Sequence, residues 1–280
     1  MKIVAIVNLL LVTLIWGLTF PIQKMVLVDI SPFAYNAIRF WIATVLSFFV
    51  FGKGNKYGLI LGVVLGISYA AQTWGLTLTT SSKSGFITAF YIVLIPIFSY
   101  FIEKEKPTKV QIFSFLIAMI GEYLLSGGID SINFGDILTF FCAILYALHV
   151  VLVTEFSKKS PEKDLLTSQF LMVALLNSLF GLNQSWKIDV KIFSVALFTA
   201  IFATIYALIA QAKYQKVVGS NTSALIFVGE PVFATIFSII LLSERLDMLQ
   251  IFGVVLTMFA LILSIIPEKY FRNFFRHVEK

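Results

Sequence analysis

Residues 3–23 read IVAIVNLLLVTLIWGLTFPIQ and contain no charged side chain. One helix needs roughly 20 apolar residues to cross a hydrocarbon core about 30 Å thick, and this stretch is long enough. A secretory signal would have a shorter apolar part and a small-residue cleavage site, whereas Trp16, Pro21 and Gln23 occupy that position. We therefore expect a retained transmembrane helix.

Similar stretches fill the rest of the chain. Three spans carry one charge each, at Arg39, Glu122 and Glu230. The charge-free runs after the first are 57–82, 84–102, 137–154, 165–186, 192–212 and 248–267, and the interrupted spans are 30–52, 110–129 and 217–243. The sequence thus predicts an all-α integral membrane protein with ten transmembrane helices and no soluble domain.

The composition supports this class. Hydrophobic residues make up 59% of the 280-residue chain and charged residues 13%, against about a quarter charged in average globular proteins. A water-soluble exterior cannot be built from so few charges. The single Cys142 excludes a disulfide within the chain.

The net charge of +6 is unevenly distributed over the predicted loops. Fifteen of the 21 basic residues, Lys53 and Lys56 among them, fall on the side that holds both termini. Lys187 and Arg245 belong to the five on the other side. This bias places both termini in the cytoplasm and predicts a multi-pass plasma-membrane protein. The basic excess is therefore topological, and we expect no nucleic-acid partner.

The two halves of the chain repeat each other. An offset of 130 pairs Trp16 with Tyr146. An offset of 139 aligns polar residues of the same type: Gln72 with Gln211, Ser99 with Ser238, Glu105 with Glu244, and Gln111 with Gln250. We expect one five-helix repeat over 1–130 and a second over 131–267, followed by a basic cytoplasmic tail over 268–280. An odd number of helices per repeat inverts the second copy, as is common in secondary transporters.

Four segments resemble the drug/metabolite transporter superfamily, and its ten-helix EamA-type exporters in particular. They read LIWGLTFP at 14–21, RFWIA at 39–43, EPVFATIFS at 230–238 and SERL at 243–246. The resemblance covers essentially the full chain and implies two EamA-like five-helix repeats that move small organic metabolites, such as amino acids, outward. Whether a proton is coupled, and whether the chain forms a homodimer, stays open.

Polar residues inside apolar spans are expected to face the bundle interior, because exposure to lipid is costly. Gln72 and Gln211 are preserved in both halves, and aromatic residues with one polar edge suit an apolar pocket. The predicted substrate-binding residues are Trp16, Thr19, Gln72, Tyr91, Tyr146, His149, Gln211 and Glu230. Gly58, Gly62 and Gly66 form a stripe that we assign to helix packing instead.

Two of these residues have alternative interpretations. His149 is either a proton shuttle or a structural residue hydrogen-bonded to a neighbouring helix. Glu230 either binds a cationic group of the solute or exchanges a proton, or it fixes its helix through a buried hydrogen bond. Arg39, His149 and a substrate amine are its candidate partners, although Arg39 has its own interpretation as a side chain that extends to the outer interface.

The absence of other motifs narrows the function. No Walker A sequence and no HExxH occur, and two histidines with one cysteine make no zinc centre. We therefore expect neither an ATP-driven pump nor a cofactor or metal, and predict a transporter rather than an enzyme. The alternative class is an intramembrane enzyme acting on a lipid or peptide, which would need a serine beside His149. A channel would need a continuous polar stripe, which the sequence lacks.

Overall fold

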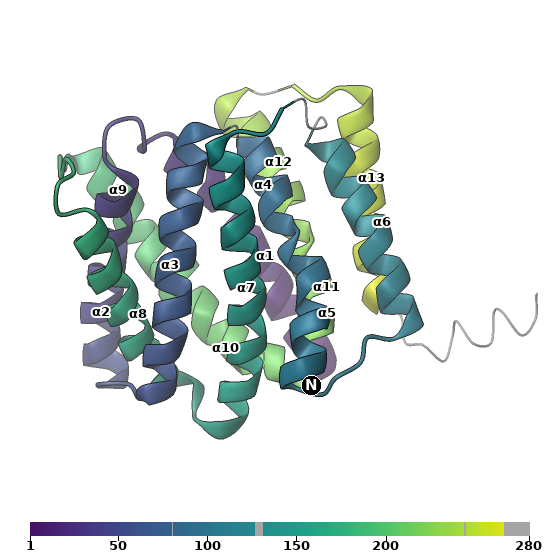
Figure 1. Ribbon diagram of the computed structural model, residues 1–280, viewed down its shortest axis with the longest axis horizontal. Coiled ribbons are helices and arrows are strands. Elements are labelled where there is room, and N and C mark those ends of the chain that lie inside the picture. Colours follow the sequence, from purple (N-terminus) through teal and green to yellow (C-terminus); the bar gives the residue numbers. More distant parts are fainter. Residues whose placement is uncertain (80, 127–130, 244, 266–280) are drawn as a thin grey trace, which may run out of the picture.

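The computed structural model describes residues 1–79, 81–126, 131–243 and 245–265, and every regular element in these ranges is a helix (Figure 1). Glu244 and the predicted tail over 268–280 lie outside the described residues. The elements are α1 (Lys2–Lys24), α2 (Pro32–Phe51), α3 (Lys56–Leu78), α4 (Ser81–Ala89), α5 (Tyr91–Ile102), α6 (Lys109–Leu125), α7 (Phe134–Lys159), α8 (Glu162–Phe180), α9 (Val190–Phe198), the π-helix η1 (Thr199–Tyr206), α10 (Ala207–Val218), α11 (Ser220–Phe227), α12 (Gly229–Leu242) and α13 (Met248–Ile265).

Several consecutive elements form longer helical segments. Residues Lys83–Ile102, Val190–Val218 and Ser220–Leu241 each run as one apolar segment, and together with α1, α2, α3 and α7 they make seven helices long and apolar enough to cross a membrane within the described ranges. Helices α6, α8 and α13 are shorter or more polar. The all-helical membrane architecture is confirmed, and the count of ten spans stays a prediction.

The helices lie roughly side by side in one bundle (Figure 1). Helix α3 packs on α7 and α8, α8 packs also on α2, and α1 crosses α12 and α10. Helices α6 and α13 pack mainly on each other and form one edge. The main apolar core lies between α1, α5, α7 and α11, where Leu9, Ile92, Val151 and Phe227 are buried.

Glycines allow the closest helix crossings. A Cβ atom on Gly62 of α3 would lie 2.5 Å from the carbonyl oxygen of Gln169 and 2.6 Å from Cβ of Met172, both on α8. Such contacts leave room for hydrogen alone. Gly58 and Gly66 meet α8 in the same way, so the stripe serves helix packing as its spacing predicts.

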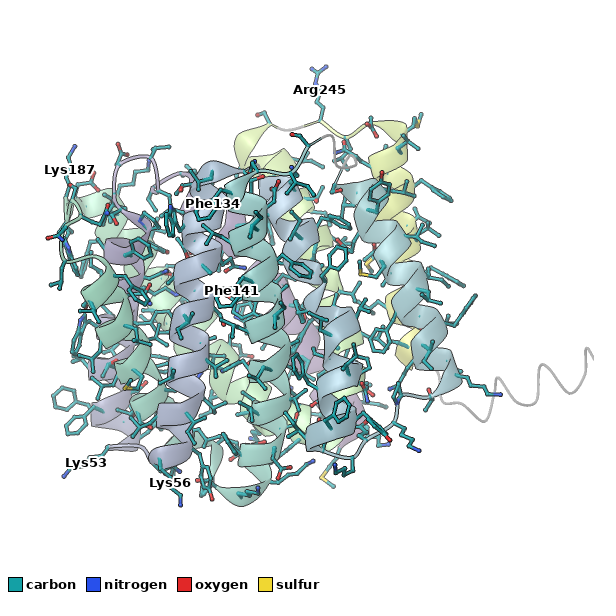
Figure 2. The ribbon with its side chains drawn as sticks, viewed as in Figure 1. Lys53, Lys56, Phe134, Phe141, Lys187 and Arg245 are labelled. Atoms are coloured by element: carbon teal, nitrogen blue, oxygen red, sulfur yellow. The ribbon has the colours of Figure 1, made fainter. Side chains whose placement is uncertain are left out.

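The exterior is apolar along the helices and charged at the ends. Phe134 and Phe141 are about half exposed along α7. Figure 2 shows Lys53 and Lys56 at one end of the bundle, near the N-terminus, and Lys187 and Arg245 at the other. Lys53 and Lys56 therefore lie at the opposite end of the bundle from Lys187 and Arg245, as the loop pattern predicts.

Candidate functional site

A central cavity lies inside the bundle and is lined by α1, α3, α5, α7, α10, α11 and α12. Its space, including the part open to solvent, is about 720 Å³. All eight residues predicted to bind substrate line it: Trp16, Thr19, Gln72, Tyr91, Tyr146, His149, Gln211 and Glu230. These eight residues come from six helices, which the fold brings to one place.

Sequence reasoning missed two polar residues of the wall, Tyr69 and Thr73, which lie on α3 beside Gln72. Gln23, which helical spacing places on one stripe with Trp16 and Thr19, also lines the cavity. The signal for Tyr69 was its position one turn before Gln72 and Thr73, which places all three on one helical face. Because Tyr69 is aromatic, it was grouped with the apolar residues of the span and not with the polar ones.

Trp16 is held by an unusual backbone feature of the neighbouring helix. In η1 the backbone N–H of Ala207 bonds to the carbonyl of Phe202, five residues earlier. The Ala203 carbonyl accepts from Trp16 Nε1 at 3.0 Å and from Arg39 Nη2 at 3.4 Å. The π-helix therefore provides the acceptor that orients the indole ring. The Trp16 ring also contacts Phe227, with 5.2 Å between centroids.

Helices α3, α5 and α7 contribute a connected polar and aromatic wall. Tyr146 Oη donates to Gln72 Oε1 at 2.9 Å. The Tyr146 ring lies edge-on to Tyr91 on one side and to Tyr69 on the other, with centroid distances of 6.4 and 5.9 Å. This wall offers both apolar ring faces and amide or hydroxyl groups to a solute.

Glu230 follows a single-residue irregularity, at Val228, within the helical segment Ser220–Leu241. Helix α11 ends at Phe227 and α12 begins at Gly229. Pro231 has no N–H to donate to the carbonyl four residues earlier and disfavours helical geometry in the residue before it. A Cβ on Gly17 would lie 2.6 Å from Cβ of Phe233, so glycine lets α12 approach α1 closely. Glu230 is thus the second residue of α12, and this part of α12 packs against α1, the helix that carries Trp16.

The Glu230 carboxyl forms no hydrogen bond or ion pair with the described residues, and its side chain is only partly buried because it faces the cavity. The buried interhelical hydrogen bond that we considered for it is therefore not formed within these ranges. A carboxylate exposed only to a membrane-buried cavity is costly unless a ligand, water or a proton neutralises it. Glu230 is available to a solute.

Arg39 does not extend to the membrane interface. It lies on α2 and is 1% exposed. Its Nε donates to Thr204 Oγ1 at 2.8 Å, and its guanidinium stacks on Tyr69 and Phe40 at 5.0 and 5.3 Å. The interpretation as an outward-reaching side chain is wrong, because hydrogen bonds and aromatic faces inside the bundle hold the guanidinium.

His149 combines a cavity position with a structural contact. It is 3% exposed, and its Nε2 lies 3.3 Å from Nε2 of Gln169 on α8. This contact to a neighbouring helix favours the structural interpretation of the two. No serine hydroxyl bonds to His149 in the part of the chain that the structure describes.

A chain of hydrogen bonds continues from the cavity toward the end where α7 and α10 terminate. Gln211 Nε2 donates to Gln215 Oε1 at 2.9 Å, and Gln215 Nε2 donates to Thr154 Oγ1 at 2.6 Å. The Thr154 and Ser220 hydroxyls are 2.7 Å apart. This chain ties α10 to α7 and α11.

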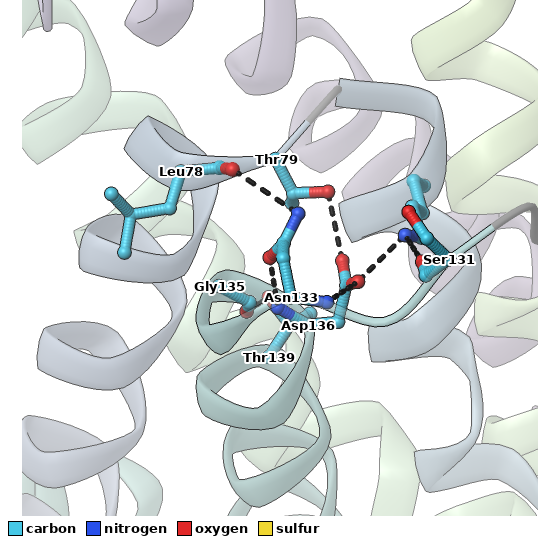
Figure 3. Close-up of polar contacts among 8 residues, drawn as sticks. Leu78, Thr79, Ser131, Asn133, Gly135, Asp136 and Thr139 are labelled. Carbon is cyan, nitrogen blue, oxygen red and sulfur yellow. Dashed lines mark hydrogen bonds and ion pairs between the residues drawn. The ribbon is translucent and has the colours of Figure 1, made fainter.

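A second polar cluster lies at the opposite end of the bundle, where α3 ends and α7 begins (Figure 3). Asp136 Oδ1 accepts from Thr79 Oγ1 at 2.8 Å, and Asp136 Oδ2 lies 2.6 Å from Lys83 Nζ. Asn133 adds a backbone N–H to the same carboxylate at 2.8 Å. The cavity therefore lies between two side-chain networks, one at each end.

Known proteins match the whole chain. The EamA-like transporter family matches at residues 3–127 and again at 133–266. An uncharacterized transporter of Archaeoglobus fulgidus is 37% identical over 266 residues, which cover 94% of this chain and 86% of that protein. An uncharacterized transporter of Buchnera aphidicola is 26% identical, and the match covers 98% of this chain and 98% of that protein.

The fold also matches a solved structure. A crystal structure of a protein superposes with a TM-score of 0.78 at 15% identity, covering 95% of this chain and 97% of that one. At this identity the likeness shows the fold alone. The two family matches and the Archaeoglobus relative fix the class, and they agree with a multi-pass bundle built around one central cavity. The chain belongs to the EamA-like transporter family and is a membrane transporter.

Proposed function

We propose that this transporter is a secondary carrier that exports small organic metabolites, with zwitterionic solutes such as amino acids as its substrate class. The observation that carries the proposal is the lining of the central cavity. It contains one carboxyl group, Glu230, together with amides, hydroxyls and aromatic rings, and no Lys or Arg among the lining residues of the described ranges. Phosphorylated solutes would call for basic residues there.

Glu230 and Gln211 both suit the amine end of a zwitterion, because each offers it an oxygen atom. The Glu230 carboxylate would pair with the solute amine, which supplies the missing counter-charge. The Oε1 atom of Gln211 is buried and has no partner within the described residues, so it would accept a further N–H. The rings of Trp16, Tyr91 and Tyr146 would cover the apolar part.

The mechanism we propose is alternating access between two inverted halves, 1–130 and 131–267. The offset of 139 that relates the halves also pairs Tyr91 with Glu230, and both residues stand in the first turn after a one-residue irregularity in a helical segment, in α5 and α12. Opening one side would break the Asp136 cluster while the Gln215 chain holds, and opening the other would do the reverse. Both termini would face the cytoplasm of a cell whose plasma membrane holds the carrier.

Transport by the purified protein in proteoliposomes tests the proposal. Vesicles loaded with labelled amino acids should lose label faster when they hold the protein, and Glu230→Gln should abolish efflux of amine-bearing solutes. Asp29→Asn, which changes an exposed acid, is the matched control and should transport like wild type.

Thermal unfolding separates loss of function from loss of fold. Cys142 is the only cysteine of the chain and is fully buried, so a thiol-reactive dye reports unfolding. If folded Glu230→Gln exports amino acids at the wild-type rate, the charge has no part in binding. If folded wild type moves none of a broad panel of metabolites, the substrate class is wrong.

A further inference from the structure

A second cavity lies between α6, at the edge of the bundle, and the neighbouring helices α1, α4 and α12. It is enclosed by residues of α1, α4, α6 and α12, and its space, including the part open to solvent, is about 430 Å³. We call it the lateral cavity and define it by six of its lining residues: Phe20, Phe86, Glu122, Ser126, Thr235 and Ser238. Glu122 is the acidic residue that interrupts the predicted span at 110–129.

The Glu122 carboxyl is buried without a counter-charge. The residue is 1% exposed, and neither of its carboxyl oxygens has a hydrogen-bond partner within the described ranges. Thr257 on α13 faces it without completing a bond of good geometry. An ionised carboxylate in such surroundings is strongly disfavoured, so the group holds a proton unless water or a cation reaches it.

The charged groups of the packed elements leave this carboxyl uncompensated. Helices α11 and α13 carry no charged residue within their described lengths. Helix α12 contributes a second acid, Glu230, and α5 contributes the phenol of Tyr91, so neither helix supplies a positive charge there. Lys83 of α4 is engaged by Asp136 and by the Ser131 carbonyl, at the outer end of its helix.

Helix α1 carries lysines only at its two ends. Lys24 donates to the carbonyls of Leu76 and Thr79, and Lys2 is exposed at the first residue of the helix. Neither is among the residues that line the lateral cavity. Within the described ranges, no lysine of these helices therefore neutralises the Glu122 carboxyl.

The two cavities share walls. Phe20 lines both of them. The consecutive residues Glu230 and Pro231 line the central and the lateral cavity respectively, at the start of α12. A displacement of the start of α12 would therefore change the surroundings of the solute site and of the Glu122 carboxyl together, which gives a physical route for coupling.

We propose that Glu122 is the site at which a coupling proton binds and leaves during transport, separate from the solute at Glu230. In one conformation the carboxyl carries the proton as an O–H group. In the other, water reaches the lateral cavity, takes the proton, and leaves a carboxylate. The coupling half of this proposal rests on the proposed transport function, whereas proton exchange at Glu122 does not.

Infrared difference spectroscopy of the full-length protein in lipid tests proton exchange without any solute. The carbonyl stretch of a protonated carboxylic acid should disappear when acidic buffer is replaced by alkaline buffer. Glu122→Gln should remove one such band, Glu230→Gln a different one, and Asp29→Asn neither. A Glu122 band that persists unchanged in alkaline buffer overturns the proposal, because the acid is then permanently protonated. A band that disappears on adding Na⁺ at constant pH overturns it in favour of a sodium site.

Proton flux tests the coupling. Vesicles containing a pH-sensitive dye should show proton movement on addition of a transported solute, and Glu122→Gln should abolish that movement while Asp29→Asn keeps it. Unchanged proton movement in Glu122→Gln overturns the coupling role. If Glu122→Gln does not fold, Glu122→Asp replaces it: it moves the carboxyl within the same site and should shift both the acid band and the pH at which that band disappears. A band unchanged in Glu122→Asp does not come from Glu122 and contradicts the proposal. Lack of any solute flux by wild type contradicts the proposed function and leaves the infrared result valid.

Discussion

Tyr146 of α7 donates its hydroxyl hydrogen to Gln72 of α3, with 2.9 Å between Oη and Oε1. The bond joins a residue of the second half of the chain to one of the first, across the wall of the central cavity. It fixes the orientation of the Gln72 amide, because the carbonyl end faces the donor and the NH₂ end is directed elsewhere. Both residues were predicted as binding residues independently of each other.

Tyr146→Phe should weaken solute binding more than it weakens the fold. Losing one hydrogen bond costs about 1 kcal/mol of stability, whereas the freed Gln72 amide can rotate and no longer presents one orientation to the solute. We expect the half-saturation constant of transport to rise severalfold, with a small decrease in the unfolding temperature. Tyr123→Phe on α6, where the side chain is about half exposed, is the control. A larger effect in Tyr123→Phe would contradict the assignment.

Gly62→Ala should destabilise the bundle. The added methyl group would lie 2.5 Å from the Gln169 carbonyl oxygen and force α3 away from α8. Overpacking of this kind costs about 1–3 kcal/mol. Dye labelling of Cys142 during heating measures the loss. Gly85→Ala provides the comparison, since a Cβ there meets nothing within 4 Å; equal unfolding temperatures for the two variants would show that the helices separate freely.

Glu105 should make stability depend on pH. It lies between α5 and α6, where burial, and secondarily the nearby Glu103 carboxylate, raise its pKa above the ordinary value of 4.5, against the opposing effect of Lys158. A raised pKa in the folded state means that the protonated form is the favoured one. Its contribution is therefore present below the ordinary pKa of a glutamate and is lost as the pH rises through the raised value.

The comparison of wild type with Glu105→Gln isolates this effect. The glutamine mimics the protonated acid, so the two proteins should unfold at similar temperatures in acidic buffer. The glutamine variant should become the more stable one as the pH rises. Thermal unfolding at a series of pH values measures the difference. A difference that shrinks toward alkaline pH would mean that the Glu105 carboxylate is stabilised in the fold.

The helical class and the residues that line the central cavity could be predicted from the sequence, because both follow from local rules. Apolar runs give spans, and a costly polar residue within a span points inward, as Gln72, Gln211 and Glu230 do. The contacts between helices followed from no such rule. The stacking of Arg39 on Tyr69 and the placement of Glu122 in a second cavity depend on which helix faces which, and that information is not local.

Helix breaks were predictable only in part. A proline inside a span does not by itself end the helix, since α1 continues through Pro21 as far as Lys24 and α5 contains Pro96. Only at Pro231 does a helix start just before the ring, which occupies the first turn where no N–H is required. Sequence alone does not say which carbonyl can find another donor, and that choice decides between a break and a continuous helix.

The π-helical turn at η1 has a consequence for how this protein can vary over generations. The acceptor that holds Trp16 and Arg39 is a main-chain oxygen of Ala203, so substitutions there leave it in place as long as the side chain fits a fully buried position. Removing one residue from 199–206 would instead restore ordinary pairing and withdraw that oxygen from both side chains. Scanning mutagenesis, which replaces side chains one at a time, would leave this hydrogen-bond acceptor in place. A one-residue deletion within 199–206 would remove it. Selection for this feature would therefore act through the length of the segment rather than through the identity of a residue.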